Sequence, residues 1–329
     1  MSEYLEGLVL KRIGVVTSGG DAPGMNAAIR AVVRTAYPKG LQVYGFLRGY
    51  EGLINNSFMR LDPRAVGGII HLGGTILRTI RCPEFRTRKG IKKAAETLKK
   101  NRIDGLVVIG GNGSFRGAYA LSKQTDTAIV GVPATIDNDV YGTEETIGFD
   151  TAVNTAVSEI DKIRDTAVSH ERVFIVEVMG RKRGFLALTV GLTVGAENIL
   201  VPELGFNTDE ICNDILESIK KGKRSSIIVA AEGVKGTRKL AKQIHKRTGC
   251  EVRLTVLGHV QRGGHPTARS RMLACLFGEK AVETLLNKEE DKIICINRNQ
   301  LTTLSLKETV KHEKPLNMEL LELAKRLAV

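Results

Sequence analysis

Short β-rich runs alternate with amphipathic segments along nearly the whole chain, and this alternation limits the folds open to it. Strand and helix in strict alternation predict a mostly parallel, doubly wound α/β sheet. The expected strands are residues 13–17, 106–109, 129–132, 173–178, 199–201, 227–230, 254–257 and 293–296. The expected helices are residues 91–100, 151–164, 208–220 and 271–286, with two more beginning near residues 23 and 114.

The length of 329 residues allows a large buried core and suggests two domains or one large α/β unit. Hydrophobic residues make up 42% of the chain and charged residues 26%, as in ordinary globular proteins. The longest apolar stretch, residues 186–201, is interrupted by Glu197 and Asn198, so we expect no membrane-spanning helix. Residues 1–12 carry two Glu and few apolar residues, which argues against a secretory signal and favours a cytoplasmic protein.

Five widely scattered cysteines fit reduced thiols better than a disulfide framework or a zinc site. The formal net charge of +13 is compatible with nucleic acid, a membrane surface or phosphorylated small molecules as partners. Because the chain has no Trp and only 5% aromatic residues, stacking platforms for nucleic-acid bases are scarce. We therefore favour phosphate-bearing metabolites, although part of the positive charge is typical of a solvated surface.

Two glycine-rich turns follow expected strands and lead into expected helices. They are Thr-Ser-Gly-Gly-Asp-Ala-Pro-Gly-Met-Asn at 17–26 and Gly-Gly-Asn-Gly-Ser at 110–114. Glycine lets the backbone approach a phosphate closely, and a helix N-terminus favours an anion. Neither turn matches a P-loop or the usual dinucleotide fingerprint. Each turn taken alone is a weak signal, because tight βα turns need Gly for structural reasons more often than not.

Two carboxylates, Asp137 and Asp139, close the apolar run at 129–139. In an extended segment residues two apart share a face, so both acids are expected to face one crevice at the carboxyl end of a strand. There one Asp can accept a hydroxyl proton while the other helps to hold a metal, as phosphoryl transfer requires. Taken alone, an acidic turn with local hydrogen bonds is favoured by roughly two to one.

Basic side chains recur beside these segments, and guanidinium groups suit bidentate phosphate binding. Solvated arginines are the alternative for each one, a structural histidine for His259, and a helix-capping role for Glu232. Their shared position near expected strand ends and Gly-rich turns favours phosphate binding for the group. The group consists of Arg81, Arg172, Arg181, Arg253, His259 and Arg262.

These motifs, in this order, resemble the bacterial 6-phosphofructokinases from Ile13 to about Leu323. The strings that carry the resemblance are those at 17–30, 83–86, 135–139, 178–181 and 256–264. The resemblance implies ATP-dependent phosphorylation of the 1-hydroxyl of fructose 6-phosphate, a step of glycolysis. It makes Asp137 the general base, with Thr135 beside it, and lets Arg181 and Arg81 stabilise the charge on the moving phosphoryl group.

The resemblance also assigns the binding residues. Those for ATP are Gly20, Arg81, Cys82, Gly111, Asn112, Gly113 and Ser114. Those for the sugar phosphate are Thr135, Asp137, Arg172, Met179, Gly180, Arg181, Glu232, Arg253, His259 and Arg262. In this family the equivalents of Arg172 and Arg253 reach in from a neighbouring subunit, so the resemblance implies an oligomer, usually a homotetramer. The implied domains are 1–149 plus 261–310 for ATP, and 150–260 plus 311–329 for fructose 6-phosphate.

Three positions bear on the phosphoryl donor and on Mg²⁺. Pyrophosphate-dependent relatives typically have Asp where this chain has Gly113 and Lys where it has Ala134, so ATP is favoured; Ala134 itself replaces the usual Gly. Asn112 stands where the family has a magnesium-associated Asp, which leaves Asp139 as the implied carboxylate for the metal. Because Asn lacks the negative charge, we expect weaker metal dependence or lower turnover than is usual.

The family's effector site between subunits is partly retained. Arg30 and Arg34, one helical turn apart, match it, but Pro63 and Gly68 replace an expected Arg and an acidic residue. The other matching residues are Arg164, Glu197, Lys221, Lys223 and Arg224. Allosteric control by a nucleoside diphosphate or phosphoenolpyruvate is therefore a hypothesis.

Three alternatives remain open. One is a kinase for another sugar phosphate, because the arginines recognise the phosphate more than the sugar. Another is a catalytically weakened regulatory paralogue, which Asn112 suggests and which intact Asp137, Thr135 and Arg181 argue against. Nucleic-acid binding through the positive charge is the last, and salt-sensitive retention on DNA would support it.

Overall fold

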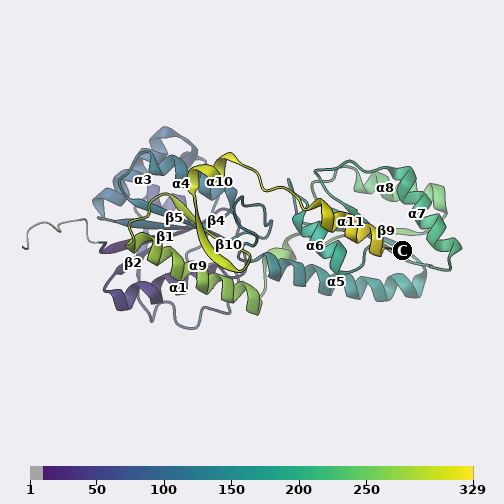
Figure 1. The fold of residues 1–329 in the computed structure, drawn as a ribbon, viewed down its shortest axis with the longest axis horizontal. Helices are drawn as coiled ribbons and strands as arrows, with labels where there is room; N and C mark the ends of the chain where they lie inside the picture. The colour runs from purple at the N-terminus through teal and green to yellow at the C-terminus, as the bar shows by residue number, and fades with distance from the viewer. Residues whose placement is uncertain (1–9, 329) are drawn as a thin grey trace, which may run out of the picture. The chain divides into compact units, whose positions relative to one another are not determined.

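The computed structural model describes residues 10–328, so most of the segment considered for a secretory signal lies outside the described residues. These residues form two compact units (Figure 1). Unit 1 comprises residues 10–135, 139–148 and 262–314, and unit 2 comprises residues 136–138, 149–261 and 315–328. Both units have α/β architecture with mostly parallel sheets, as the alternation predicted.

Within the described residues, the sheet of unit 1 has seven strands in the order β11-β10-β5-β4-β1-β2-β3. Its central strands are parallel, whereas β3 and β11 are antiparallel edge strands. The strands are β1 (Arg12–Ser18), β2 (Gln42–Phe46), β3 (Phe58–Leu61), β4 (Gly105–Gly110), β5 (Ala128–Pro133), β10 (Lys292–Asn297) and β11 (Gln300–Ser305). The expectation of strict strand–helix alternation was therefore wrong at the edges, where the β10–β11 hairpin has no crossover helix.

Helices cover the sheet of unit 1, and α1 packs closely against α9. A Cβ at Gly278 would lie 2.6 Å from the Cβ of Ala31, so glycine permits this approach. The α-helices of the unit are α1 (Met25–Ala36), α2 (Tyr50–Ile54), α3 (Arg88–Lys100), α4 (Asn112–Ser122), α9 (Ala268–Leu286) and α10 (Leu306–Lys311). Two short 3₁₀ helices are η1 (Tyr37–Lys39) and η2 (Glu84–Arg86), and a third, η3 (Gly258–Arg262), precedes α9.

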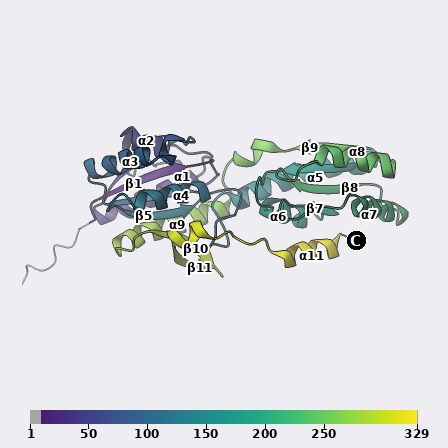
Figure 2. The same cartoon turned by 90° about the horizontal axis from the view of Figure 1, so that it is seen from above.

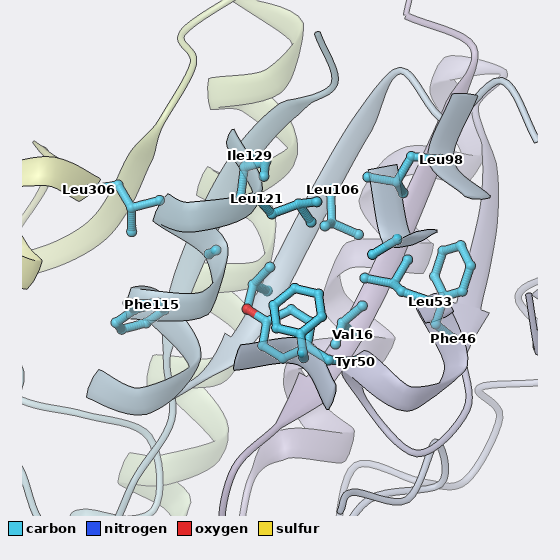
Figure 3. Close-up of a cluster of buried hydrophobic side chains, with 14 of the residues drawn as sticks. Val16, Phe46, Tyr50, Leu53, Leu98, Leu106, Phe115, Leu121, Ile129 and Leu306 are labelled. Carbon is cyan, nitrogen blue, oxygen red and sulfur yellow. The ribbon is translucent and has the colours of Figure 1, made fainter. Parts of the chain in front are cut away.

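The core of unit 1 fixes the first turn of α4. Phe115 is fully buried with Leu106 and Leu121 (Figure 3), and each such side chain contributes roughly 1.5–3 kcal/mol by leaving water. The ring of Tyr50 stacks on Phe85 at 3.8 Å, and its hydroxyl donates a 2.5 Å hydrogen bond to the Ser114 carbonyl. Burial raises the pKa of Tyr50, so this hydroxyl stays a donor at physiological pH.

Unit 2 has a four-stranded, fully parallel sheet in the order β7-β8-β6-β9 within the described residues. The strands are β6 (Val173–Val178), β7 (Asn198–Leu200), β8 (Ser226–Ala231) and β9 (Val252–Val256). The helices are α5 (Phe149–His170), α6 (Phe185–Thr193), α7 (Thr208–Lys220), α8 (Thr237–Thr248) and α11 (Met318–Leu327). The C-terminal helix α11 packs beside α6 and β7 (Figure 2).

Every expected strand and helix is present, with ends shifted by a few residues. The structure shows the five cysteines as free thiols, as predicted. No helix among the described residues is long and apolar enough to cross a bilayer.

Candidate functional site

The two predicted glycine-rich turns of unit 1 lie side by side. The strands that precede them, β1 and β4, are parallel neighbours with Ser18 opposite Gly110. The Ser114 hydroxyl donates a buried 2.8 Å hydrogen bond to the Ser18 carbonyl and so joins the turns directly. A Cβ at Gly110 would lie 2.5 Å from both the Ser114 Oγ and the Ser18 carbonyl oxygen, so only glycine fits there. The structure thus brings both turns to one edge of the sheet.

The helices that follow these turns begin without side-chain caps. The N-cap residues are Gly24 for α1 and Gly111 for α4, and neither supplies a capping side chain. The first N–H groups of a helix lack intrahelical partners and carry partial positive charge. An uncapped helix N-terminus reached over glycine backbone suits the binding of a phosphate.

Arg262 belongs to unit 1 and lies against the first of these turns. Its Nη1 donates a 3.3 Å hydrogen bond to the Asp21 carbonyl, and a Cβ at Gly20 would lie 2.6 Å from that nitrogen. Absence of a side chain at Gly20 therefore makes room for the guanidinium. The other predicted basic residue in this unit, Arg81, is exposed and makes no hydrogen bond or ion pair with residues 10–328, while neighbouring Cys82 is half-buried.

The segment after β5 differs from the expected extended chain. Thr135 packs next to Gly111, whose added Cβ would lie 3.2 Å from the Thr135 Cβ, and its N–H donates to the Ile147 carbonyl at 3.0 Å. Ile136 and Asp137 then form a turn, and Asn138 has a φ of +49°. The expectation that Asp137 and Asp139 share a strand face was therefore wrong, because a left-handed residue separates them.

Asn112 and Asp139 are in direct contact. The Asn112 Nδ2, at the start of α4, donates a 2.9 Å hydrogen bond to the backbone carbonyl of Asp139. The amide oxygen of Asn112 remains available as an acceptor, and Asp139 supplies a carboxylate. No cluster of three or more His, Cys, Asp or Glu suited to a metal occurs among the described residues. One carboxylate and one amide fit a Mg²⁺ that arrives on nucleotide phosphates better than a site made by protein alone.

Lys314 adds a positive charge close to this segment, a position that the sequence did not reveal. Its Nζ donates a 2.9 Å hydrogen bond to the Glu144 carbonyl. Burial lowers the pKa of Lys314 to about 8, and the carboxylates of Asp139, Glu144 and Glu145 oppose that shift. The chain passes from unit 1 to unit 2 directly after this residue.

In unit 2 the carboxyl ends of three strands gather several predicted residues. Met179 and Gly180 follow β6, Glu232 follows β8, and His259 follows β9. The Glu232 N–H donates to the Val178 carbonyl at 2.8 Å, which joins the first two ends. Arg181 is exposed beside them, as are Glu232 and His259. This edge therefore presents one carboxylate, one imidazole and one guanidinium to a polar ligand.

Gln261 completes this edge and was missed by the sequence analysis. Its side chain is fully buried; Oε1 accepts from the Met179 N–H at 3.2 Å and Nε2 donates to the Gly258 carbonyl at 2.9 Å. It thereby ties the end of β6 to the turn that carries His259. Only its place within the string at 256–264 could have drawn attention to it.

Arg172 and Arg253 lie at the other end of the strands of the same sheet, where the strands begin. Arg172 directly precedes β6, and Arg253 is the second residue of β9. Six residues of strand separate Arg172 from Met179, a span of about 20 Å at the usual rise. Within one chain these arginines therefore lie apart from the strand ends that carry Glu232 and His259.

The predicted effector residues are divided between the units. Arg30 and Arg34 lie on α1 in unit 1, and the remaining five lie in unit 2. Arg164 donates to the Val194 carbonyl, Lys223 pairs with Glu197 at 2.5 Å, and Arg224 pairs with Glu171 at 2.5 Å. Glu197 and Lys221 also line a cavity of about 560 Å³ bordered by β7, α7 and α11.

Fold and site together define an α/β protein in which two glycine-rich turns adjoin at the carboxyl ends of parallel strands. The family model for phosphofructokinase matches residues 12–285. The chain belongs to the phosphofructokinase family, as the sequence motifs predicted.

Full-length relatives agree with this family. An ATP-dependent 6-phosphofructokinase from Thermoanaerobacter sp. (strain X514) is 52% identical over 321 residues, covering 97% of this chain and 100% of the relative. An ATP-dependent 6-phosphofructokinase from Clostridium botulinum (strain Loch Maree / Type A3) is 51% identical over 315 residues, covering 96% and 98%.

Solved structures share the fold. Pichia pastoris phosphofructokinase in the T-state superposes with a TM-score of 0.87 and 37% identity, over 93% of this chain and 36% of the longer yeast chain. A pyrophosphate-dependent phosphofructokinase from Marinobacter aquaeolei superposes with a TM-score of 0.84 over 94% of this chain and 86% of the other. At 24% identity the latter likeness concerns the fold alone.

Proposed function

We propose that this protein transfers the γ-phosphoryl group of ATP to the 1-hydroxyl of fructose 6-phosphate, as an ATP-dependent 6-phosphofructokinase in glycolysis. The observation that carries the proposal is the joined pair of glycine-rich turns after β1 and β4. It occurs in a chain whose relatives of that name align over their full length. No observation favours a kinase for another sugar phosphate or a regulatory paralogue.

In the proposed reaction Asp137 accepts the proton of the sugar hydroxyl, and Thr135 lies two residues before it. Arg181 and Arg81 stabilise the negative charge on the phosphoryl group as it moves, since both guanidinium groups are exposed. Phosphoryl transfer requires little covalent chemistry from the protein, so positioning and electrostatic stabilisation supply most of the rate enhancement.

Each unit takes one substrate in this proposal. The turns at 19–24 and 110–114 and the first residues of α1 and α4 bind the nucleotide phosphates. The strand ends with Met179, Gly180, Glu232 and His259 bind fructose 6-phosphate, with Gln261 holding two of these ends together. Arg262 contributes to the sugar-phosphate site from its place beside Gly20.

ATP is the proposed donor rather than pyrophosphate. Gly113 is exposed, and a Cβ there would meet nothing within 4 Å, so the position leaves room for the rest of a nucleotide. When Mg²⁺ is bound with ATP, it neutralises charge on the phosphate oxygens. Asp139 and the amide oxygen of Asn112 are the side-chain groups of this chain that would hold it.

We further propose a cytoplasmic homotetramer. Arg172 and Arg253 lie about 20 Å from Met179 along the sheet of unit 2, so they are expected to serve the site of a neighbouring subunit. Allosteric control stays a hypothesis, and a nucleoside diphosphate or phosphoenolpyruvate should change the saturation curve for fructose 6-phosphate if it is correct.

A coupled assay of the purified chain tests the function. ATP and pyrophosphate are crossed with fructose 6-phosphate and other sugar phosphates, each with Mg²⁺ or Mn²⁺. The proposal expects turnover with ATP and fructose 6-phosphate, and loss of at least about a hundredfold in kcat for Asp137→Asn. A higher kcat/KM with pyrophosphate, or with another sugar phosphate, would contradict it.

A further inference from the structure

Glu251 joins the two arginines at the amino edge of the sheet of unit 2. Strands β6 and β9 are parallel neighbours with Val173 opposite Val252, so Arg172 and Glu251 occupy matching positions just before them. The Nε of Arg172 donates to the Glu251 Oε2 at 2.7 Å, and the Nη2 of Arg253 contacts Oε1. Each carboxylate oxygen therefore holds one guanidinium group.

The two arginines keep unused donors beyond this carboxylate. Among residues 10–328, neither Arg172 nor Arg253 has a hydrogen bond or ion pair with a side chain other than Glu251. Glu171, the other carboxylate beside Arg172 in the chain, is engaged with Arg224. Arg172 is 23% exposed and Arg253 57% exposed, so both side chains are partly accessible to solvent.

The charges of the three groups sum to +1. Two adjacent guanidinium groups repel each other, and the carboxylate between them cancels that repulsion. The hydrogen bond from Arg172, with the nearby charges of both arginines, lowers the pKa of Glu251, so the carboxylate is ionised at neutral pH. Paired guanidinium groups with free N–H donors match a phosphate dianion.

We propose that Glu251 is a positioning residue that holds Arg172 and Arg253 together as one binding unit for the phosphate of the sugar phosphate. This inference rests on the proposed function of the two arginines. Exposed ion pairs stabilise folded proteins very little, so fold stability does not account for Glu251. Preorganisation does, because each long side chain that is already ordered loses less entropy when the ligand binds.

Two effects of Glu251 on an anion have opposite signs, which makes the test decisive. Its negative charge repels phosphate, so removal of the charge alone would tighten binding. Its hydrogen bonds order the arginines, so removal of these hydrogen bonds would weaken phosphate binding. The inference requires the second effect to dominate.

Steady-state kinetics of Glu251→Gln against fructose 6-phosphate give the first readout. The expected result is a KM raised about 5- to 30-fold, from the loss of order in two side chains, with kcat and the KM for ATP changed less than about twofold. Glu159→Gln is the matched control, since Glu159 forms a comparable exposed ion pair with Lys162 on α5 of the same unit. An unchanged or lower KM for fructose 6-phosphate in Glu251→Gln would overturn the inference.

Double variants show whether Glu251 acts through the arginines. Glu251→Gln is combined with Arg172→Ala and with Arg253→Ala, and its effect should shrink in each background because the groups form one unit. Glu251→Asp, which keeps the charge, should recover part of the affinity. An effect of equal size in both Arg→Ala backgrounds would assign Glu251 a merely structural role.

Titration calorimetry with inorganic phosphate separates this inference from the proposed function. Failure of the parent protein to phosphorylate fructose 6-phosphate would contradict the function, whereas calorimetry requires no turnover. Weaker phosphate binding by Glu251→Gln than by the parent and by Glu159→Gln supports the positioning role of Glu251. Equal or tighter binding overturns it.

Discussion

Asn112→Asp introduces the carboxylate expected of the family and removes the hydrogen bond that Asn112 donates to the Asp139 carbonyl. In the parent, the Asn112 Nδ2 donates to the Asp139 carbonyl at 2.9 Å. An Asp at 112 has no donor for that oxygen and adds a negative charge beside it. The substitution therefore affects folding and metal use in opposite directions.

The magnitude follows from three contributions. An unsatisfied, partly buried carbonyl costs about 1–3 kcal/mol, and a carboxylate in the first turn of α4 returns about 0.3–1 kcal/mol. Without metal, the variant should thus be less stable by about 1 kcal/mol, a lowering of the melting temperature on the order of 2 °C. For a carboxylate about 4 Å from a divalent cation, even a water-like dielectric gives about 2 kcal/mol, so the half-saturating Mg²⁺ concentration should fall about thirtyfold.

Two measurements check these values. One is turnover against free Mg²⁺ at fixed ATP and fructose 6-phosphate; the other is thermal unfolding in a chelator. Asn317→Asp is the control, because Asn317 caps α11 through an oxygen that accepts from the Leu320 N–H, and Asp keeps that bond while adding the same charge. Coincident Mg²⁺ curves for parent and Asn112→Asp would refute the assignment of Asn112 to the metal. Equal melting temperatures in chelator would refute the account of its hydrogen bond.

Three further predictions follow from single contacts. Gly113→Asp has open space for its Cβ, so the variant should fold normally while its charge raises the KM for ATP by about tenfold, measured with ATP as the varied substrate. Gly20→Ala places a Cβ 2.6 Å from the Arg262 Nη1, so the guanidinium should move and the KM for fructose 6-phosphate should rise with a stability loss of only about 1 kcal/mol; an unchanged KM would remove Arg262 from the binding site. Lys314 has a folded-state pKa of about 8 against 10.5 for the free side chain, so the unfolded chain holds the extra proton between these values and stability should rise with pH across that window by about 3 kcal/mol. Lys314→Met should lose this rise, and parallel pH–stability curves in urea unfolding would contradict the buried charge.

The buried parallel strands could be predicted because each is a short apolar run between turn residues. All six residues of β4 are buried, and its continuous run of apolar residues and glycine predicts this burial. The edge strands β3 and β11 carry mixed, partly exposed residues, so their signal is absent. Strand β2 was also not predicted, because Gly45 interrupts its apolar sequence. Glycine is needed there because a Cβ would lie 2.4 Å from Leu77, a contact that no local pattern reveals.

The site divides in the same way. Glycine-rich turns that join a strand to a helix are local features, so they could be predicted from the chain alone. The side chains of Asp137 and Asp139 do not share a face because Asn138 between them is left-handed. The sequence offered an indication of this, since Asn tolerates the left-handed conformation better than most residues. Gln261 and Lys314 act through neighbours distant in sequence, so their roles required the folded chain.

The topology of unit 2 has a consequence for assembly. A parallel sheet places every strand's amino end at one edge and every carboxyl end at the other. Arg172 and Arg253 lie at the first edge, held by Glu251, whereas Met179, Glu232 and His259 follow strands at the second. A strand of six residues spans about 20 Å, so the two sets lie at separate ends of the sheet. In the proposed homotetramer, the two arginines of one copy would therefore serve the sugar-phosphate site of a neighbouring copy, and Glu251 would hold them in position for it.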